Sequence, residues 1–378
     1  MNRRNFLVAS GSVALTASVA LGERAVGAER YTEAAYSRAM VIDALGAVGE
    51  FDPTAPEGAG LSARALADAK ASGVTTVNLT VGSVGNGPGQ FEETVRWIAE
   101  AEREFARHPD VLLKVRSAKD IESAKATRRV GVIYGFQDSS MLEGDLQRLE
   151  IFEGLGVRIV QPVYSLRNLM GDGCLEKRDA GLTVMGHSLI EEINRQRILL
   201  DLSHASPRTI MDGIEASKAP MAITHTGCRD LVDVPRNVDD RTLRALADKG
   251  GVAGIYFMPF LRASGQPHAE DLIRHLEHAV NVCGEDHVGL GTDGIISGIR
   301  LDAAFAERQR NFYEERKKQG IAAPGEAPDV FNLIPEYNEP RRFMTVATDL
   351  SRRGWTSSRI DKVLGGNFLR LFREAWGA

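Results

Sequence analysis

Three short apolar runs decide how this chain folds: ILLDLSH (198–204), PMAITHT (220–226) and HVGLGTD (287–293). Each run is typical of a buried β-strand, and each ends at or beside a residue type that binds metals, namely His204, His225 and Asp293. In a parallel barrel the C-terminal ends of the strands meet at one face, where reactive groups gather. The three runs therefore predict a site of the metal-dependent hydrolase type at the mouth of a barrel.

The remainder of the chain repeats this alternation of short β-branched runs and longer segments with helical periodicity. Further strands are predicted at 39–45, 74–81, 130–137, 157–164 and 251–257. Helices are predicted at 91–108, 145–156, 185–197, 240–250 and 269–284. Eight strands, most of them separated by a helix, predict an α/β fold of the (β/α)₈ barrel type. A doubly wound open sheet is the alternative, but no GxGxxG motif follows the first strand.

Several segments depart from the alternation. The run 111–117 lies close before the third predicted strand, so we expect an extra strand or an extended connection outside the eight. Residues 296–345 are polar and contain a charged helix candidate at 303–320. Because they follow the last strand, we expect a lid over the mouth, with a peripheral decoration or a homodimer contact as the alternative. Residues 343–354 and 357–376 predict two helices that seal the barrel.

The composition limits the class of protein. With 378 residues, 43% hydrophobic and 26% charged, the chain has ordinary globular composition. The net charge of −5, without a cluster of basic residues, argues against a nucleic-acid-binding role. Cys174, Cys228 and Cys283 are widely spaced and form no CxxC motif, so we expect free thiols rather than a zinc knuckle or a disulfide framework.

Residues 1–28 resemble a twin-arginine export signal. Paired Arg3 and Arg4 precede Phe6 and Leu7, an apolar stretch rich in Gly, Ala and Ser follows, and small residues around Ala28 suit cleavage. A membrane anchor is the alternative, but a stretch of about 16 residues is short for a membrane span. We therefore expect a single barrel domain over 29–378 that is exported to the periplasm and has no transmembrane span in its mature form.

The histidines differ in what their positions indicate. A single histidine at the end of a strand is more often a hydrogen-bonded core residue than a ligand. His204 and His225, however, follow apolar runs on consecutive predicted strands, and neutral imidazoles suit zinc or a similar cation. His275 and His278 share a helix with a charged outer face, so we expect them at the surface.

Two charged residues are further candidates for the site. Asp293 follows the eighth strand, where an aspartate binds metal, orients water or holds a substrate amine, although a turn or a helix N-cap is the simpler role. Arg236 suits a substrate carboxylate, because a guanidinium binds carboxylates in a bidentate manner. The alternative for Arg236 is a structural salt bridge with Asp239 or Asp240.

Longer motifs resemble one family. The segments that carry the resemblance are LLDLSHASPRTIMD, ITHTGCRDLVDVPRNVDD, LADKGGVAGIYF, HVGLGTDG and GGNFLR. They are similar to the renal (membrane) dipeptidase family of zinc metallopeptidases, and the resemblance covers most of residues 39–376. It implies a (β/α)₈ barrel that holds two zinc ions bridged by a glutamate and hydrolyses dipeptides, including those that end in a D-residue.

The resemblance also implies roles for individual residues. His204 and His225 match the two histidines of the family's second zinc ion. Arg236 matches the arginine that binds the substrate carboxylate, and Asp293 matches the aspartate at the end of the last strand, near the scissile bond.

The chain departs from the family at the first zinc ion. The family's H-x-D motif aligns with Leu45, Gly46 and Ala47, none of which can ligate through a side chain, and the bridging glutamate aligns with Gln137. A neutral amide does not offset the charge of two dications as a carboxylate does. Another family histidine aligns with Tyr164, whose hydroxyl can donate to an oxyanion. The nearest carboxylates that could substitute for the missing ligands belong to Asp43 and Asp138.

These observations predict a dipeptidase-like metallohydrolase with one zinc ion rather than two. His204 and His225 are the expected metal ligands, with Gln137 or Asp293 as the third. Asp293 is the expected base, Tyr164 the expected oxyanion donor, and a dipeptide or small amide would bind to Arg236 through its free carboxylate. The alternatives are a metal-free enzyme that uses the same side chains as acids and bases, and a catalytically inactive binding or maturation protein of the cell envelope.

Overall fold

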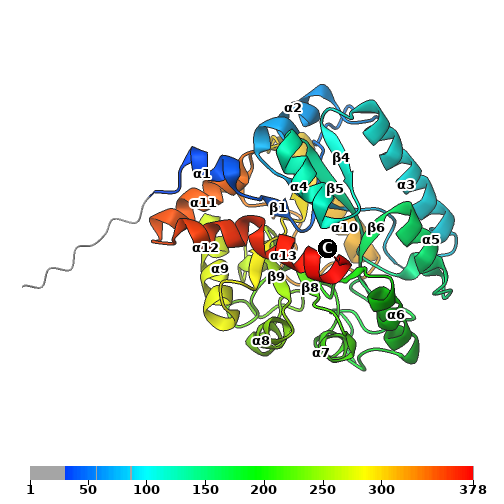
Figure 1. Ribbon diagram of the computed structural model, residues 1–378. Helices are drawn as coiled ribbons and strands as arrows, with labels where there is room; N and C mark the ends of the chain where they lie inside the picture. The colour runs from blue at the N-terminus through cyan, green and yellow to red at the C-terminus, as the bar shows by residue number, and fades with distance from the viewer. Residues whose placement is uncertain (1–29, 57, 86, 378) are drawn as a thin grey trace, which may run out of the picture.

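The computed structural model describes residues 30–56, 58–85 and 87–377 (Figure 1). The predicted export signal at 1–28 lies outside these residues. In the part of the chain that is described, no helix is long and apolar enough to cross a membrane.

Parallel strands form a closed barrel. Their order is β1 (Ile42–Asp43), β3 (Thr76–Thr80), β5 (Val130–Phe136), β6 (Val157–Val160), β7 (Leu199–Leu200), β8 (Ala222–Thr226), β9 (Val252–Ile255) and β10 (Val288–Leu290). A parallel bridge between Asp201 and Ala222 joins β7 to β8, and the amide of Ala44 donates to the carbonyl of Leu290, 2.9 Å away, to join β1 to β10. The predicted α/β barrel is therefore confirmed.

Three short strands lie outside this ring. β4 (Leu112–Val115) pairs in parallel with the first half of β5, whereas β6 pairs with the second half, so the run at 111–117 forms an extra strand. β2 (Gly46–Ala47) pairs in parallel with β11 (Gly294–Ile295) just beyond the ends of β1 and β10. This last pair places the loop of Asp293 beside the segment that carries Leu45 and Ala47.

Helices surround the strands (Figure 1). They are α1 (Glu33–Arg38), α2 (Ala63–Ser72), α3 (Gln90–Arg107), α4 (Ala118–Thr127), α5 (Arg148–Leu155), α6 (Val184–Arg195), α7 (Pro207–Ala216), α8 (Asp240–Asp248) and α9 (Ala269–Cys283). Several begin at a side chain that caps the first turn: Ser62, Thr183, Ser206 and Asp239 each accept a hydrogen bond from a backbone amide of their own helix. The predicted helix positions agree with these bounds to within a few residues.

The tail of the chain seals the N-terminal end of the barrel. α11 (Arg342–Arg352) and α12 (Ser357–Asp361) lead to α13 (Asn367–Trp376), whose Phe368 and Phe372 belong to a buried cluster with strand residues such as Ile42. The prediction of one continuous helix over 357–376 is wrong at Gly365. A Cβ there would lie 2.5 Å from the carbonyl oxygen of Met40, so only glycine allows the close approach that turns the chain.

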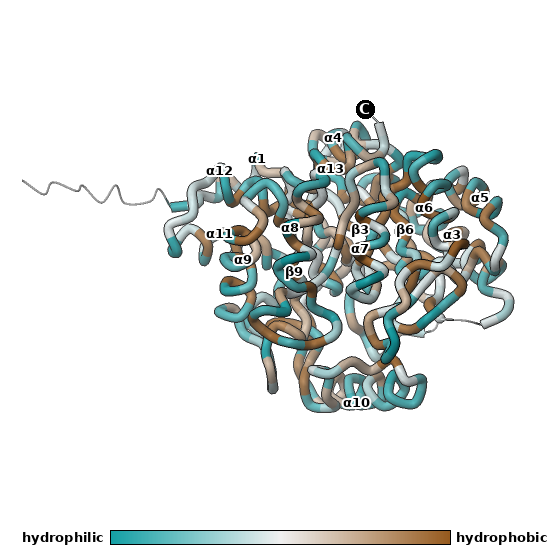
Figure 2. The backbone as a smooth tube through the Cα atoms, turned by 90° about the horizontal axis from the view of Figure 1, so that it is seen from below, coloured by the Kyte–Doolittle hydropathy of each residue, from teal (hydrophilic) through white to brown (hydrophobic). Residues whose placement is uncertain are grey.

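The opposite end of the barrel carries α10 (Ala303–Lys318), the helix of the 296–345 segment. Figure 2 shows α10 at one end of the molecule and α13 at the other. Because the strands are parallel, this arrangement separates the sealed end of the barrel from the end at which the strands terminate.

Candidate active site

His204 and His225 meet at the C-terminal ends of β7 and β8. Their Nε2 atoms lie 2.9 Å apart and their ring centroids 4.9 Å apart, and both side chains are buried. The convergence expected from the two apolar runs is therefore present. The two Nε2 atoms lie within hydrogen-bonding distance of each other, so both imidazoles are close enough together to serve one ion.

The hydrogen bonds behind His225 fix the position of its proton. The buried carboxylate of Asp201 accepts the hydroxyl of Thr224 at 2.6 Å, so the single hydroxyl proton of Thr224 points toward Asp201. The Nδ1 atom of His225 lies 2.9 Å from the same Thr224 oxygen and must therefore donate to it. This leaves the lone pair of His225 on Nε2, directed toward His204.

His204 has a more crowded environment. Its Nδ1 atom lies 3.1 Å from the hydroxyl of Ser165, and its Nε2 atom lies 3.2 Å from Oε1 of Gln137. The ring of Tyr164 stacks on the imidazole at 4.0 Å between centroids. Gln137 is oriented by its own amide, which donates to the hydroxyl of Thr80 at 2.8 Å. The amide oxygen of Gln137 is therefore turned toward the two histidines.

Both imidazoles are neutral. Burial lowers the pKa of His204 and of His225 well below 6.5, and the positive charge of Arg236 lowers both further. A neutral imidazole is the form that ligates a metal or accepts a proton.

Arg236 reaches the histidines from the loop between β8 and α8. Its Nη1 donates to the carbonyl of Ser203, and its Nη2 lies 3.3 Å from Nε2 of His204. The salt bridge to Asp239 or Asp240, considered as the alternative, is not formed: Asp239 caps α8, and Asp240 pairs with Arg244 and His278. Arg236 is thus a buried cation at the mouth of the barrel.

Asp293 lies at the same end of the barrel, immediately before β11. Its backbone has a φ of 57°, in the left-handed region, and its amide donates to the carbonyl of Leu45 at 2.8 Å. Burial raises the pKa of Asp293 to about 6, against the opposing effects of Arg236 and Arg316. The carboxylate therefore lies within the field of both arginines and titrates close to neutral pH.

Around the positions where the resemblance implies the first zinc ion, the carboxylates of the described residues are engaged in structural hydrogen bonds. Leu45 is buried and apolar. The carboxylate of Asp43 accepts hydrogen bonds from the amide and the hydroxyl of Thr292, at 2.7 and 2.6 Å. Asp138 accepts from the amide of Gly85 and the side chain of Asn168, at 2.9 and 2.8 Å. Both carboxylates hold loops together, so the expectation that they substitute for the missing ligands is not supported.

No cluster of three or more His, Cys, Asp or Glu side chains with metal-binding geometry occurs in the described ranges. The donors that the structure brings together at the mouth are two imidazoles and the amide oxygen of Gln137. This set suits one borderline cation such as zinc, and it lacks the carboxylate that bridges two.

No pattern in the sequence indicates a further member of the site, Arg316 at the end of α10. Its Nη1 donates to the hydroxyl of Tyr164 at 3.3 Å. Arg316 lies in a charged stretch, ERKKQG, in which no pattern distinguishes it from its neighbours. Only the folded chain shows that this one side chain turns inward.

His275 is not at the surface as expected. It is buried, its Nδ1 accepts a hydrogen bond from the amide of Cys228 at 2.9 Å, and its Nε2 lies 3.1 Å from the carbonyl of Leu261. Burial lowers its pKa to about 4. The charged residues of α9 mark one face of the helix, and His275 lies on the other, so its role is to satisfy backbone groups in the core. The three cysteines are free, as expected.

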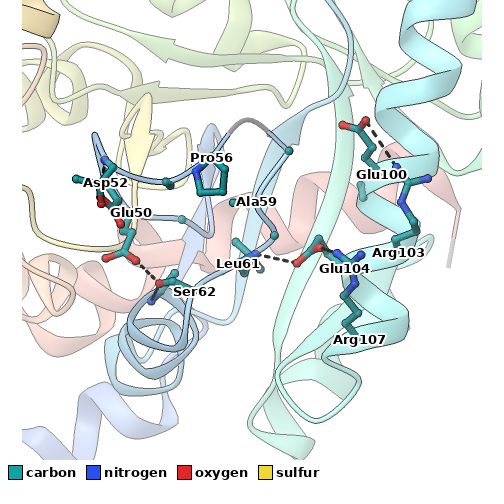
Figure 3. Close-up of a pocket in the computed structure, with 17 residues that line it drawn as sticks. Glu50, Asp52, Pro56, Ala59, Leu61, Ser62, Glu100, Arg103, Glu104 and Arg107 are labelled. Atoms are coloured by element: carbon teal, nitrogen blue, oxygen red, sulfur yellow. Dashed lines mark hydrogen bonds and ion pairs between the residues drawn. The ribbon is translucent and has the colours of Figure 1, made fainter.

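Two cavities are lined by residues other than those predicted for the site. One of about 600 Å³ lies between the loops that follow β3, β5 and β6, and its lining includes Ser139 and Asn168. Another of about 850 Å³ lies between the 49–62 loop and α3 (Figure 3). In this second cavity Glu104 accepts a hydrogen bond from the amide of Leu61 at 2.9 Å, and none of the predicted site residues lines it.

The barrel and the two converging histidines define a protein of the metal-dependent hydrolase type. The sequence profile of the membrane dipeptidases (peptidase family M19) matches residues 64–301, and the chain belongs to this family. A crystal structure of an amidohydrolase from Pseudomonas aeruginosa is 30% identical, with a TM-score of 0.77 over 91% of this chain and 99% of that one.

Two further proteins are similar to this chain in sequence at slightly lower identity. An uncharacterized protein in the pqqA 5′ region of Klebsiella pneumoniae is 29% identical over 69% of this chain and 88% of its own length. The dipeptidase tcpJ of Claviceps purpurea is 27% identical over 75% of this chain, and the match spans 60% of that protein.

Proposed function

We propose that this protein is a metal-dependent hydrolase of the dipeptidase type, which cleaves a dipeptide or a small amide that bears a free carboxylate. The observation that carries the proposal is the convergence of two neutral imidazoles, His204 and His225, beside the guanidinium of Arg236. Amide hydrolysis needs an activated water, a donor for the developing oxyanion and an anchor for the substrate. Each requirement has a candidate residue at the mouth of the barrel.

We infer one zinc ion, held by His204, His225 and the amide oxygen of Gln137. Two nitrogen ligands of a tetrahedral zinc ion lie about 3.3 Å apart, and the two Nε2 atoms, at 2.9 Å, need to separate only slightly. Both imidazoles engage a hydroxyl through Nδ1, which orients Nε2 as in many zinc sites. A bound zinc ion supplies Lewis acidity and lowers the pKa of a water molecule.

Among the residues that the structure describes, a second ion has no comparable set of donors. Leu45 and Ala47 stand where the family has ligands, and Gln137 stands where the family has a bridging carboxylate.

The chain's own residues supply the remaining steps. Arg236 binds the free carboxylate of the substrate and thereby sets its register in the mouth. Asp293, with its pKa near 6, is mostly ionised at neutral pH and accepts a proton from the attacking water. The hydroxyl of Tyr164 donates to the carbonyl oxygen as negative charge develops there.

Elemental analysis of the full chain, combined with a dipeptide hydrolysis assay, tests the proposal. We expect about one zinc ion per chain in the wild type, its loss in His204→Ala and in His225→Ala, and its retention in the control His187→Ala, a residue on the exposed face of α6. Protein that contains no zinc and hydrolyses no dipeptide between pH 5 and 9 contradicts the proposal.

A restored site tests the number of ions. The triple variant Leu45→His, Ala47→Asp and Gln137→Glu reinstates the family's ligand types, and we expect its zinc content to rise from about one to about two per chain. Two ions already present in the wild type would contradict the single-ion inference.

A metal-free enzyme is the second candidate, and the position of Arg236 favours it. A guanidinium 3.3 Å from Nε2 of His204 opposes a cation at the histidines, which would then act as an acid–base pair. Hydrolysis that persists after complete chelation would support this candidate. Ligand binding without turnover, with or without added zinc, would instead support a binding or maturation protein of the cell envelope.

We also propose that residues 1–28 direct the protein to the periplasm through the twin-arginine route. The paired Arg3 and Arg4 ahead of a short apolar stretch support this. Replacing both with lysine should leave the precursor in the cytoplasm, as measured by cell fractionation, and unchanged export would contradict the proposal.

A further inference from the structure

Arg316 is the residue through which the 296–345 segment contacts the candidate active site. It is the last arginine of α10, on the end of the barrel opposite α13 (Figure 2). Its side chain is only 14% exposed, and that of its partner Glu326 only 3%. A buried ion pair of this kind holds its members in one geometry, because breaking it would leave an uncompensated charge.

The guanidinium is fixed on three sides. Nε donates to one carboxylate oxygen of Glu326 at 2.7 Å, and Nη2 donates to the other at 2.9 Å. Nη2 also donates to the carbonyl of Ile321 at 2.9 Å. Glu326 is held in turn by the amide of Ala323, which donates to it at 2.9 Å. The remaining nitrogen, Nη1, is thereby directed at the hydroxyl of Tyr164, 3.3 Å away.

This contact determines how Tyr164 uses its only proton. An arginine donates and does not accept, so the oxygen of Tyr164 is the acceptor. The phenolic proton must therefore point elsewhere, and within the described part of the chain no acceptor for it is found. Since the ring of Tyr164 stacks on His204 at 4.0 Å, the hydroxyl is anchored beside the two histidines.

We propose that Arg316 is a positioning residue that presents the hydroxyl of Tyr164 as a hydrogen-bond donor to the carbonyl oxygen of a bound amide. The 296–345 segment thereby completes the oxyanion-stabilising apparatus of the barrel, and Tyr164 keeps its proton throughout. The inference rests on the proposed function, because it assigns a role toward the same substrate. It predicts that Arg316 acts only through Tyr164 at a pH well above the pKa of Asp293, where the charge of Arg316 no longer changes the protonation of that base.

A double-mutant cycle tests this dependence. We expect Tyr164→Phe to lower kcat about a hundredfold, as for the loss of one oxyanion donor. Arg316→Met should lower kcat about tenfold with little change in KM, and Arg316→Lys should restore part of the loss. In the Tyr164→Phe background, assayed at about pH 8.5 so that Asp293 stays ionised, Arg316→Met should have no further effect. Arg310→Met, an exposed position on the same helix, is the matched control.

Binding and spectroscopy separate the inference from the proposed function. A phosphinate analogue of a dipeptide carries a tetrahedral anion, so Arg316→Met should weaken its binding far more than that of the parent dipeptide, measured by calorimetry. In the ligand-free protein, the ¹³Cζ resonance of Tyr164 should shift in Arg316→Met and in Glu326→Gln, but not in Arg310→Met.

The outcomes are distinct. Wild-type protein that cleaves dipeptides while Arg316→Met retains full kcat, or loses activity additively with Tyr164→Phe, overturns the inference and leaves the proposed function standing. Wild-type protein that neither cleaves dipeptides nor binds the phosphinate overturns both. An unchanged Tyr164 resonance in Arg316→Met contradicts the hydrogen bond itself, whatever the activity.

Discussion

The two halves of the barrel mouth differ in what they retain. At the ends of β7 and β8, His204 and His225 bring their Nε2 atoms together, and polar side chains behind them engage their Nδ1 atoms. At the end of β1, Asp43 joins β1 to the loop after β10 through Thr292, but the positions in front of it hold Leu45 and Ala47, whose side chains cannot ligate a metal. The hydrogen bonds that hold the strand ends together therefore occur both with and without histidines in front of them.

The largest difference between the two halves is expected for substitutions at His204 and Leu45. We expect His204→Ala to lower kcat/KM about a thousandfold, because it removes a ligand or an acid–base group. We expect Leu45→Ala to leave kcat/KM within about threefold while lowering the free energy of unfolding by about 2 kcal/mol, because it opens a cavity in a buried position. Steady-state kinetics measures kcat/KM, and urea unfolding measures the free energy of unfolding. A Leu45→Ala enzyme as inactive as His204→Ala would contradict the difference between the two halves of the mouth.

A second prediction compares the two structural aspartates. Asp201 accepts hydrogen bonds from Ser203, Thr224 and Gln161. In Asp201→Asn the new NH2 group faces some of these donors and cannot accept from them. We expect a loss of about 3 kcal/mol in the free energy of unfolding. Asp43→Asn, with fewer donors to satisfy, should cost about 1 kcal/mol. Equal losses in the two variants would show that both halves depend on their aspartate to the same degree.

The third prediction concerns pH and stability. Burial raises the pKa of Asp43 to about 7, despite opposing hydrogen bonds from Thr292. The folded state therefore retains a proton that the unfolded state releases near pH 4, and the contribution of Asp43 to stability falls as pH rises from about 4 to about 7. We expect a slope of about −1 kcal/mol per pH unit between pH 5 and 7, absent in Asp43→Asn. A wild-type slope equal to that of the variant would refute this assignment.

The last prediction concerns Asp293 as the base. Since its pKa is about 6, activity should rise with pH along an acid limb centred near that value and fall about tenfold per unit below it. Removing the charge of Arg236 or Arg316 should move the limb to higher pH, because both arginines lower this pKa. Asp293→Asn should show a low activity without the limb. A limb that persists in Asp293→Asn would assign it to another group.

Much of the fold could be predicted because the relevant signals are local. The strand runs ending near His204, His225 and Asp293 are short, apolar and followed by polar residues, and such runs are buried wherever parallel strands form. The meeting of the two histidines followed directly from the geometry of a parallel barrel. These features required no knowledge of which distant residues touch.

The features that were missed depend on contacts distant in sequence. Arg316 is 152 residues from Tyr164 along the chain, and nothing within its charged stretch predicts which side chain turns inward. Gly365 breaks a predicted helix because the carbonyl of Met40 approaches it, and the pattern around 357–376 is helical throughout. His275 lies inside because its helix packs against the backbone of Cys228 and Leu261. The orientation of these side chains and the break at Gly365 are determined by tertiary packing.

The packing of α13 has a consequence for the order of folding. Phe368 and Phe372 fill the space beneath β1, β5 and β7, more than 300 residues after Ile42, the first strand residue that they cover. During synthesis the apolar side chains at this end of the early strands are therefore exposed until α13 has been synthesised and has docked. Contacts between residues this far apart in the sequence slow folding and prolong the lifetime of aggregation-prone intermediates. We therefore expect this chain to depend on chaperones until α13 docks.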